Sequence, residues 1–376
     1  MNNKIINIAY VSHFPHYKMG GQRSMLTLIE NLDRSKFRPF VILPAEGELS
    51  HRLQELNCQT KIIPLTSLKP KNARTIISNI SKIRKFIKME KIDILHPDFE
   101  RDTFVSGLAK QFTTTQMVWH VRLTRPESLD KINAQLSDGI IGISDATKKR
   151  FLNVKNINSK FTKIFNGVDC DKFKPASDKT QLRYELQLPQ DRKIVIFVGQ
   201  IKDSKGIADI IEAASYLKET DYTQLPLFLL IGDFASAQYE RQIKEIIAEK
   251  KLQNLLIHIS QQNNIEKWFA AADILLLPSY EGSEGMGRVL FEAMACGIVP
   301  IGTNISGINE AITRDTGILV NEHSPREIAE AIIHLIVSQT FYSKMSSAAL
   351  LRARKSFDIQ QHARKVENFY LKLLNK

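Results

Sequence analysis

The sequence predicts an α/β protein of two domains, each built on a parallel β-sheet that helices cover on both faces. The chain has 376 residues, which is more than one ordinary domain needs. Short apolar, β-branched runs alternate with longer amphipathic stretches along the chain, an order typical of parallel sheets. A polar stretch near the middle interrupts this order and indicates a domain boundary.

The predicted strands are continuous apolar runs, which indicates that both faces of each sheet are buried. In chain order they are residues 5–11, 40–43, 92–95, 116–120, 139–143, 194–198, 227–231, 274–277 and 298–301. Between them, segments such as 207–217 and 238–252 have helical periodicity.

The polar stretch 170–191, with Pro175 and Pro189, predicts the domain boundary. We therefore expect one domain over residues 1–180 and a second over 181–355. The remaining segment, 356–376, has the apolar spacing of a final amphipathic helix, with Val366 and Tyr370 among the residues available for burial.

Composition excludes several classes of protein. The formal charge of +12 favours anionic partners, but the basic residues are spread along the chain and form no nucleic-acid-binding motif, so we expect no nucleic acid. The three cysteines have no metal-site spacing. No apolar run approaches the roughly 18 residues of a membrane span, and no signal peptide is evident, so we expect a cytoplasmic protein.

A glycine-rich loop carries the sharpest chemical signal. It follows the predicted strand 274–277 and contains Glu284, Gly285, Met286 and Gly287 before a helix that begins near Arg288. Backbone N–H groups in such a loop and at a helix N-terminus suit a phosphate. Glu292, eight residues after Glu284, lies in an apolar stretch of this helix, where an acidic side chain needs a partner such as a ribose diol. The alternative is a tight turn followed by a solvated helix face.

The spacing Glu284-x7-Glu292, followed by Ala-Met-Ala-Cys-Gly, resembles the signature of family 4 retaining glycosyltransferases, also called glycosyl transferases group 1. Further segments resemble this family in the same order, and the resemblance spans nearly the whole chain. They are Gly20-Gly21, 141–147, 165–169, 197–199, Lys205-Gly206, 231–233, 306–310 and 317–320.

The resemblance implies the GT-B fold, in which two Rossmann-like domains face each other across a cleft. It places the acceptor on the N-terminal domain, the nucleotide-sugar donor on the C-terminal domain, and the last helix back on the N-terminal domain. Glu292 would bind the donor ribose, Glu284 would lie beside the transferred sugar, and Lys205 would contact the donor phosphates. No metal ion and no cofactor are expected.

One position departs from the family. Many relatives have a basic residue directly after Val-Gly, where this chain has Gln200. Lys202 or Arg288 would then supply the missing positive charge, and either is equally well interpreted as a surface cation. If neither reaches the diphosphate, donor binding is weak.

Two further groups are candidates in the N-terminal half. Gly20 and Gly21 precede a helix expected to begin near Ser24, and the resemblance places this loop at the cleft near the diphosphate. His120 ends a predicted strand, where open α/β sheets place ligand-contacting residues, and relatives use a nearby histidine on the acceptor side. A ligand-free turn and a structural histidine are the alternatives.

We therefore expect a metal-independent hexosyltransferase that uses a UDP- or GDP-sugar and a glycan or lipid-linked acceptor in bacterial surface polysaccharide synthesis. A GT-B epimerase or phosphorylase-like enzyme, and a weakly active sugar-nucleotide or membrane-glycan binding subunit, are the alternatives.

The segment 69–91 combines many lysines with isoleucines 76, 80, 83 and 87 at helical spacing. It predicts peripheral contact with an anionic membrane, for which an ordinary sheet-covering helix is the alternative.

Overall fold

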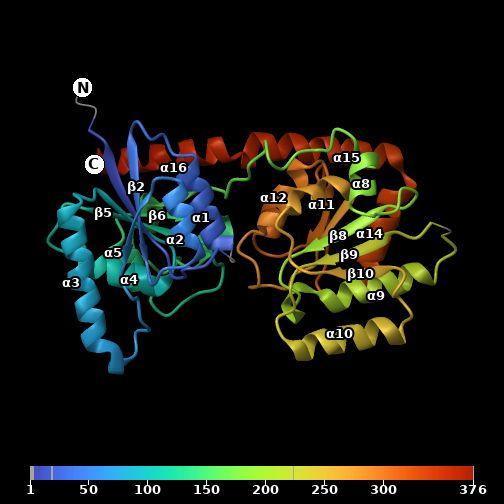
Figure 1. Ribbon diagram of the computed structural model, residues 1–376, viewed down its shortest axis with the longest axis horizontal. Coiled ribbons are helices and arrows are strands. Elements are labelled where there is room, and N and C mark those ends of the chain that lie inside the picture. The colour runs from blue at the N-terminus through green and yellow to red at the C-terminus, as the bar shows by residue number, and fades with distance from the viewer. Residues whose placement is uncertain (1–3, 18–19, 223, 376) are drawn as a thin grey trace. The chain divides into compact units, whose positions relative to one another are not determined.

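The computed structural model describes residues 4–17, 20–222 and 224–375. The chain forms two compact units (Figure 1). Unit 1 comprises residues 1–167 and 359–376, and unit 2 comprises residues 168–358. The sequence places the boundary after residue 180, whereas the units divide after Gly167, because Val168 donates a backbone hydrogen bond of 2.7 Å to Phe357 within unit 2.

Unit 1 contains a seven-stranded parallel sheet with the strand order β3-β2-β1-β4-β5-β6-β7. Its strands are β1 (Ile6–Val11), β2 (Phe37–Leu43), β3 (Gln59–Ile62), β4 (Ile94–Pro97), β5 (Gln116–Val121), β6 (Gly139–Gly142) and β7 (Phe161–Lys163). Its helices are α1 (Gly20–Glu30), α2 (Glu48–Glu55), α3 (Ala73–Met89), α4 (Glu100–Ala109), α5 (Asp130–Leu136), α6 (Asp145–Lys149), α7 (Ile157–Lys160) and α16 (Ile359–Leu374).

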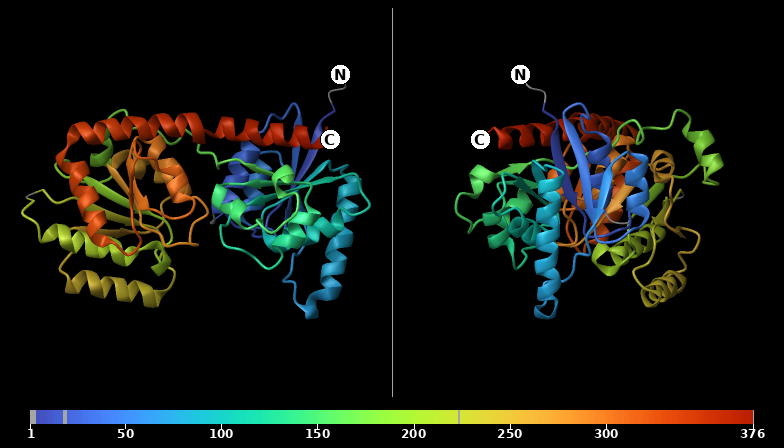
Figure 2. Two further views of the ribbon diagram at one scale, coloured as in Figure 1. Left: turned by 180° about the vertical axis from the view of Figure 1, so that it is seen from behind. Right: turned by 60° about the vertical axis from the view of Figure 1, so that its left-hand side comes forward.

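Alternate side chains of the strands fill the two faces of this sheet, as continuous apolar strands require. Ile8 and Tyr10 pack with α1, α2 and α16, whereas Ala9 and Val11 pack with α3 and α4. Figures 1 and 2 show α1 and α2 on one side of the sheet and α3 on the other. The last helix, α16, therefore completes the core of unit 1 although it ends the chain.

Unit 2 contains a six-stranded parallel sheet with the order β10-β9-β8-β11-β12-β13. Its strands are β8 (Ile194–Val198), β9 (Leu227–Ile231), β10 (Leu256–Ile259), β11 (Ile274–Leu277), β12 (Val299–Thr303) and β13 (Ile318–Val320). Its helices are α8 (Lys179–Glu185), α9 (Ile207–Lys218), α10 (Ala237–Glu249), α11 (Ile265–Ala271), α12 (Arg288–Ala295), α13 (Ile308–Ala311), α14 (Pro325–Val337) and α15 (Gln339–Arg352), with a 3-10 turn η2 (Asp203–Lys205). The predicted α/β class and its two parallel sheets are confirmed.

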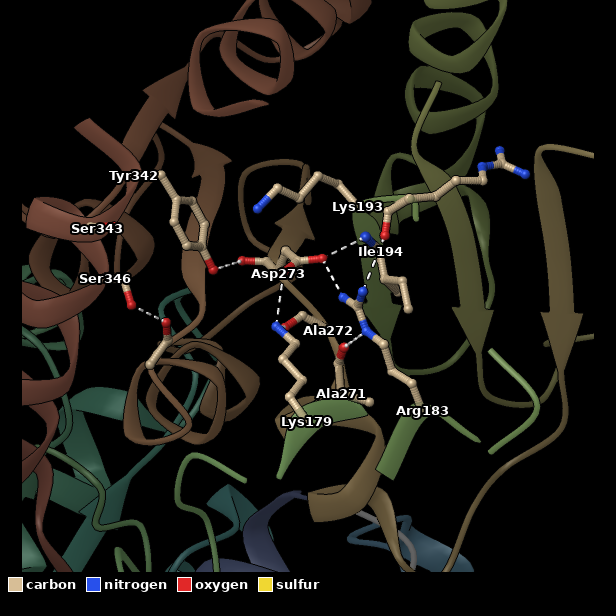
Figure 3. Close-up of polar contacts among 12 residues, drawn as sticks. Lys179, Arg183, Lys193, Ile194, Ala271, Ala272, Asp273, Tyr342, Ser343 and Ser346 are labelled. Carbon is tan, nitrogen blue, oxygen red and sulfur yellow. Dashed lines mark hydrogen bonds and ion pairs between the residues drawn. The ribbon is translucent and has the colours of Figure 1, made fainter. Parts of the chain in front are cut away.

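A buried carboxylate anchors the amino end of β11 (Figure 3). Asp273 accepts hydrogen bonds from Arg183 Nη2 (2.6 Å), Lys179 Nζ (2.8 Å) and the backbone N–H of Ile194 (2.7 Å). The Tyr342 hydroxyl donates to the Asp273 carbonyl at 3.0 Å. These contacts join α8, β8 and α15 to the strand whose other end leads into the glycine-rich loop.

Candidate active site

The loop between β11 and α12 has a path that its own residues fix. Ser279 Oγ donates a hydrogen bond of 3.2 Å to Glu284 Oε1, and the Tyr280 hydroxyl donates to Asp209 at 3.2 Å. Gly287, directly before α12, has a φ of 64°, and a Cβ there would lie 2.6 Å from the Leu277 side chain. A residue with a side chain would therefore be strained at this position, so glycine is needed to turn the loop into the helix.

Lys205 and Glu284 meet at this loop. Lys205 Nζ forms an ion pair with Glu284 Oε1 and donates to the Ser283 carbonyl at 3.1 Å. Both side chains are largely buried, 12% and 15% exposed. The next residue, Gly206, has a φ of 67°, and a Cβ there would lie 2.1 Å from the Pro278 carbonyl oxygen. This close approach seats the η2 turn, and with it Lys205, against the loop.

Lys202 lies close enough to Lys205 and Glu284 for their charges to act on it. Gln200, at the position where many relatives have a basic residue, is exposed. Burial and the charge of Lys205 lower the pKa of Lys202, and the charge of Glu284 partly opposes this. A second cation therefore lies close to the Lys205–Glu284 pair, two residues beyond the position where the sequence lacks a basic residue.

On the first turns of α12, Arg288 and Glu292 form an ion pair. Arg288 Nη2 donates a hydrogen bond of 2.9 Å to Glu292 Oε1, and the glutamate is only 6% exposed. Met286 is buried as well, at 2% exposed. The partner that a carboxylate needs in this apolar helix is thus supplied within the protein by Arg288.

In unit 1, polar side chains gather where β4 and β5 end. Arg122 Nη2 lies 3.3 Å from His120 Nδ1, Arg122 Nε lies 3.4 Å from Asp98 Oδ2, and Arg122 Nη1 donates to Asn166 at 2.9 Å. Burial raises the pKa of Asp98 to about 6 in spite of the Arg122 charge. A Cβ on Gly21 would lie 3.4 Å from Asp98 Oδ2, so the first turn of α1 borders this group.

Two family models match the chain. Glycosyltransferase Family 4 matches residues 19–172, and Glycosyl transferases group 1 matches residues 178–352. The chain belongs to the family 4 glycosyltransferases. The predicted family and the GT-B fold are therefore confirmed.

This glycosyltransferase is similar to several named proteins. It is 26% identical over 242 residues to a lipopolysaccharide core biosynthesis mannosyltransferase of Rhizobium meliloti, covering 63% of this chain and 66% of that protein. It is 24% identical over 397 residues to UDP-Gal:alpha-D-GlcNAc-diphosphoundecaprenol alpha-1,3-galactosyltransferase of Escherichia coli, covering 98% and 97%. The structure of HepE of Anabaena with UDP and glucose has a TM-score of 0.81 at 18% identity, covering 98% of this chain and 100% of that one.

Unit 2 holds two groups of predicted donor-side residues, Lys205 and Glu284 with Lys202 nearby, and Arg288 with Glu292, and their roles stay predictions. Gly20 and Gly21 differ from expectation in one respect. The helix that was expected near Ser24 is described from Gly20 onward, so both glycines lie in the first turn of α1. Their N–H groups therefore belong to a helix start in place of a loop.

Asp98, Arg122 and Asn166 were missed by the sequence reading. Asp98 and Arg122 each directly follow the last residue of a strand, the same signal that identified His120. Asn166 lies within the family-like segment 165–169 but had no assigned role. Because the predicted strands 92–95 and 116–120 stop short of the true ends of β4 and β5, only a search of the three residues after each predicted strand would have included the first two.

Among the described residues, Glu100, Glu127 and Asp130 are close enough to share a cation. Arg150 occupies this group, because it donates to Glu127 at 2.9 Å and to Asp130 at 3.0 Å. The group is therefore a partly buried ion-pair cluster at the start of α5.

The isoleucines of α3 serve the core of unit 1. Ile83 and Ile87 are buried, and Ile76 and Ile80 pack partly buried against the same cluster. These side chains cover the sheet, which favours the alternative of an ordinary sheet-covering helix, and the membrane contact stays a prediction. Among the described residues, no helix is long and apolar enough to cross a membrane.

Proposed function

We propose that this glycosyltransferase moves a hexose-type sugar from a UDP- or GDP-sugar to a glycan or lipid-linked acceptor in bacterial surface polysaccharide synthesis, with retention of anomeric configuration. The observation that carries this is the Lys205–Glu284 ion pair beside the glycine-rich loop. As the glycosidic bond breaks, the diphosphate gains negative charge and the sugar gains positive charge. A lysine and a carboxylate at one place stabilise both.

The relatives support the substrate classes. HepE has been solved with UDP and glucose, and the Escherichia coli relative is named for a UDP-sugar donor and a diphosphoundecaprenol acceptor. In this chain, Lys205 and Lys202 would hold the diphosphate, Glu292 the ribose and Glu284 the transferred sugar. Two lysines supply the charge that a metal ion supplies elsewhere, so we expect activity in the presence of EDTA.

A thermal-shift screen of nucleoside diphosphates and their sugars tests donor binding. A ligand at 100 times its dissociation constant stabilises the folded state by about 2.7 kcal/mol, which raises Tm measurably. The donor that binds is then incubated with the protein, and slow release of the free sugar shows that the glycosidic bond is activated. The anomeric configuration of a transfer product, read by NMR, tests retention.

Matched variants localise the chemistry. Lys205→Met and Glu284→Gln should abolish most sugar release, whereas Lys244→Met, which changes an exposed lysine on α10, should leave it unchanged. If no nucleoside diphosphate raises Tm and no sugar is released, the proposed function is wrong. Release without transfer to any glycan would favour a weakly active binding subunit.

For the membrane, we propose an electrostatic contact through the basic flank of α3. Lys82 and Lys85 line a groove with Lys61 of the edge strand β3, and all three lysines are exposed. Each such cation near an anionic surface adds roughly 1 kcal/mol of attraction. Sedimentation with phosphatidylglycerol vesicles should therefore fall with rising salt and in Lys82→Glu/Lys85→Glu. Binding that is equal on zwitterionic vesicles would contradict this contact.

A further inference from the structure

The edge strand β3 of unit 1 leaves backbone groups unpaired along its outer side. β3 is the outermost strand of the sheet and pairs with β2. The Ile63 N–H donates to the Leu43 carbonyl of β2 at 2.9 Å. Successive residues of a strand direct their backbone groups to opposite sides, so those of Thr60 and Ile62 point away from β2. Among the described residues, no hydrogen bond reaches these outward groups, so this edge is free to accept a further strand.

A groove of about 900 Å³ lies at this edge. It is lined by all of β3 and by the last turns of α3, and its volume is in the range of ligand-binding sites. Ile63 is fully buried and Phe86 is 8% exposed, whereas Met89, the last residue of α3, is 64% exposed. A chain added beside β3 would therefore gain apolar contacts as well as backbone hydrogen bonds.

Three exposed lysines, Lys61, Lys82 and Lys85, also line the groove. Side chains alternate along a strand, so Lys61 lies on the same face of the sheet as Ile63, which packs with α3. Among the described residues, none of the three lysines has an ion-pair partner. At the opposite edge of the sheet, Lys163 of β7 is ion-paired with Asp145. The positive charge beside β3 is thus not balanced within the chain.

A lysine on an edge strand commonly prevents edge-to-edge aggregation, and Lys61 alone would serve that purpose. Lys82 and Lys85 lie on α3 instead, one helical turn apart, where their Cβ atoms are about 5–6 Å from each other. Alternate residues of an added strand are spaced by about 7 Å and point to the same face. Two acidic side chains on one face of such a strand therefore match the spacing of these two lysines.

Other occupants use fewer of these features. Two copies of this chain paired through β3 would bring their lysines together, and like charges facing each other across strands are unfavourable. A lipid phosphate would use the lysines but not the outward carbonyls of Thr60 and Ile62, because a phosphate only accepts hydrogen bonds. An extended acidic peptide uses the lysines, the apolar wall and both kinds of backbone group.

We propose that an acidic, extended segment of another protein binds in this groove as an added strand beside β3. Its acidic side chains face Lys61, Lys82 and Lys85, and its apolar side chains lie next to the half-buried Ile62 on the other face. β2 and β1 separate β3 from β4 and β5, so this surface is distinct from the candidate active site. The proposal does not rest on the proposed glycosyl transfer.

Amide hydrogen exchange tests the open edge in the free protein. The Ile62 N–H should exchange fast because it points outward, whereas the Ile63 N–H should exchange slowly because it is bonded to Leu43. Protection of Ile62 as strong as that of Ile63 would mean that the edge is already covered and would overturn the proposal.

A phage-displayed library of random peptides, selected against the full chain, supplies the probe. Enriched peptides should alternate acidic and apolar residues, protect the Ile62 amide and bind more weakly at high salt. Lys82→Glu/Lys85→Glu should weaken their binding at least tenfold, whereas Lys244→Glu, which reverses an exposed lysine of α10, should not. Ile62→Pro removes only an outward N–H, which an edge strand tolerates, and should weaken binding severalfold.

Three results would overturn the proposal. The first is a library without binders, or with binders that neither protect Ile62 nor respond to the charge reversal. The second is binding of phosphatidylglycerol vesicles with no peptide bound, which would assign the lysines to the membrane alone. The third is a dimer, detected by light scattering and lost in Ile62→Pro, which would make a second copy the occupant of the groove.

Discussion

Arg288 donates a hydrogen bond of 2.9 Å to Glu292, one turn further along α12. The arginine was a candidate for the diphosphate, but here its guanidinium holds the carboxylate proposed to bind the ribose. A buried glutamate fixed in this way is ready to accept hydrogen bonds from two ribose hydroxyls without reorganising. This pre-organisation makes Glu292 the most direct test of donor binding.

Glu292→Ala should weaken binding of the nucleoside diphosphate by roughly ten- to a hundredfold, because a charged acceptor of hydrogen bonds is worth about 1.5–3 kcal/mol. Arg288→Gln is the control, since it breaks the same ion pair but keeps the carboxylate. Isothermal titration with the nucleotide that binds wild type measures both. An equal loss in the two variants would mean that the ion pair, and not a ribose contact, determines affinity.

Lys202 should take the place of the missing cation at residue 200. Lys202→Met is expected to weaken diphosphate binding severalfold and to reduce its dependence on salt, because one charge near the phosphates is removed. Gln200→Arg should strengthen binding, since residue 200 is exposed and has room for a longer side chain. Unchanged affinity in Lys202→Met would mean that Lys202 is an ordinary surface cation and does not contact the diphosphate.

Asp98 should impose an acidic limit on activity. Its pKa is raised by burial to about 6, with Arg122 and His13 opposing the shift and Asp102 adding to it. Below that pH the carboxyl is protonated and loses its ion pair with Arg122, the residue that contacts His120, so kcat/KM should fall. Asp98→Asn should lower kcat/KM at pH 7 and abolish this limb of the profile.

The protonation of Asp98 changes folding stability in the opposite direction to activity. Because the folded-state pKa of Asp98 is above the unfolded value, this group favours folding more as the pH falls from about 7 towards 4. Denaturant titrations of wild type and Asp98→Asn across this range should show the difference. A wild-type profile of kcat/KM that is flat down to pH 5 would mean that the ionised Asp98 carboxylate is not needed for activity.

The sequence predicts the central strands of both sheets and misses the edges. All nine predicted runs correspond to strands, and the four that were missed, β3, β7, β10 and β13, are the two edges of each sheet. Edge strands here carry exposed or half-buried residues, as in Gln59–Ile62, so they have no continuous apolar run. A parallel strand can be predicted from the sequence when both of its faces are buried, because it then forms a continuous apolar run.

The residues of the candidate site also fall into those that the sequence predicts and those that it does not. Glu284, Glu292 and Lys205 lie in local motifs, so they were predicted. The contact of Arg122 with Asn166 joins residues 44 positions apart, which no local pattern contains. Arg288 and Glu292 have the i, i+4 spacing of a helical ion pair, but that spacing was not used to assign them to each other.

The Asp273 network in Figure 3 should determine the stability of unit 2. Asp273→Asn removes the charge that balances Arg183, and both side chains are under 10% exposed. An unbalanced buried charge costs about 3–5 kcal/mol, so Tm should fall by several degrees. Glu240→Gln, the same chemical change in an exposed pair with Lys244, should leave Tm unchanged.

Acid should weaken the same network. Burial raises the pKa of Asp273, but the charges of Lys179 and Arg183 and the hydrogen bonds from Lys179 and the Ile194 N–H outweigh it, so the pKa lies below the ordinary value. The stabilisation is therefore complete above the unfolded-state pKa near 4 and is lost as the pH falls below it. Denaturant titrations from pH 7 to pH 3 should show wild type losing its advantage over Asp273→Asn. If the difference between them is constant across this range, the ionised carboxylate is not what stabilises β11.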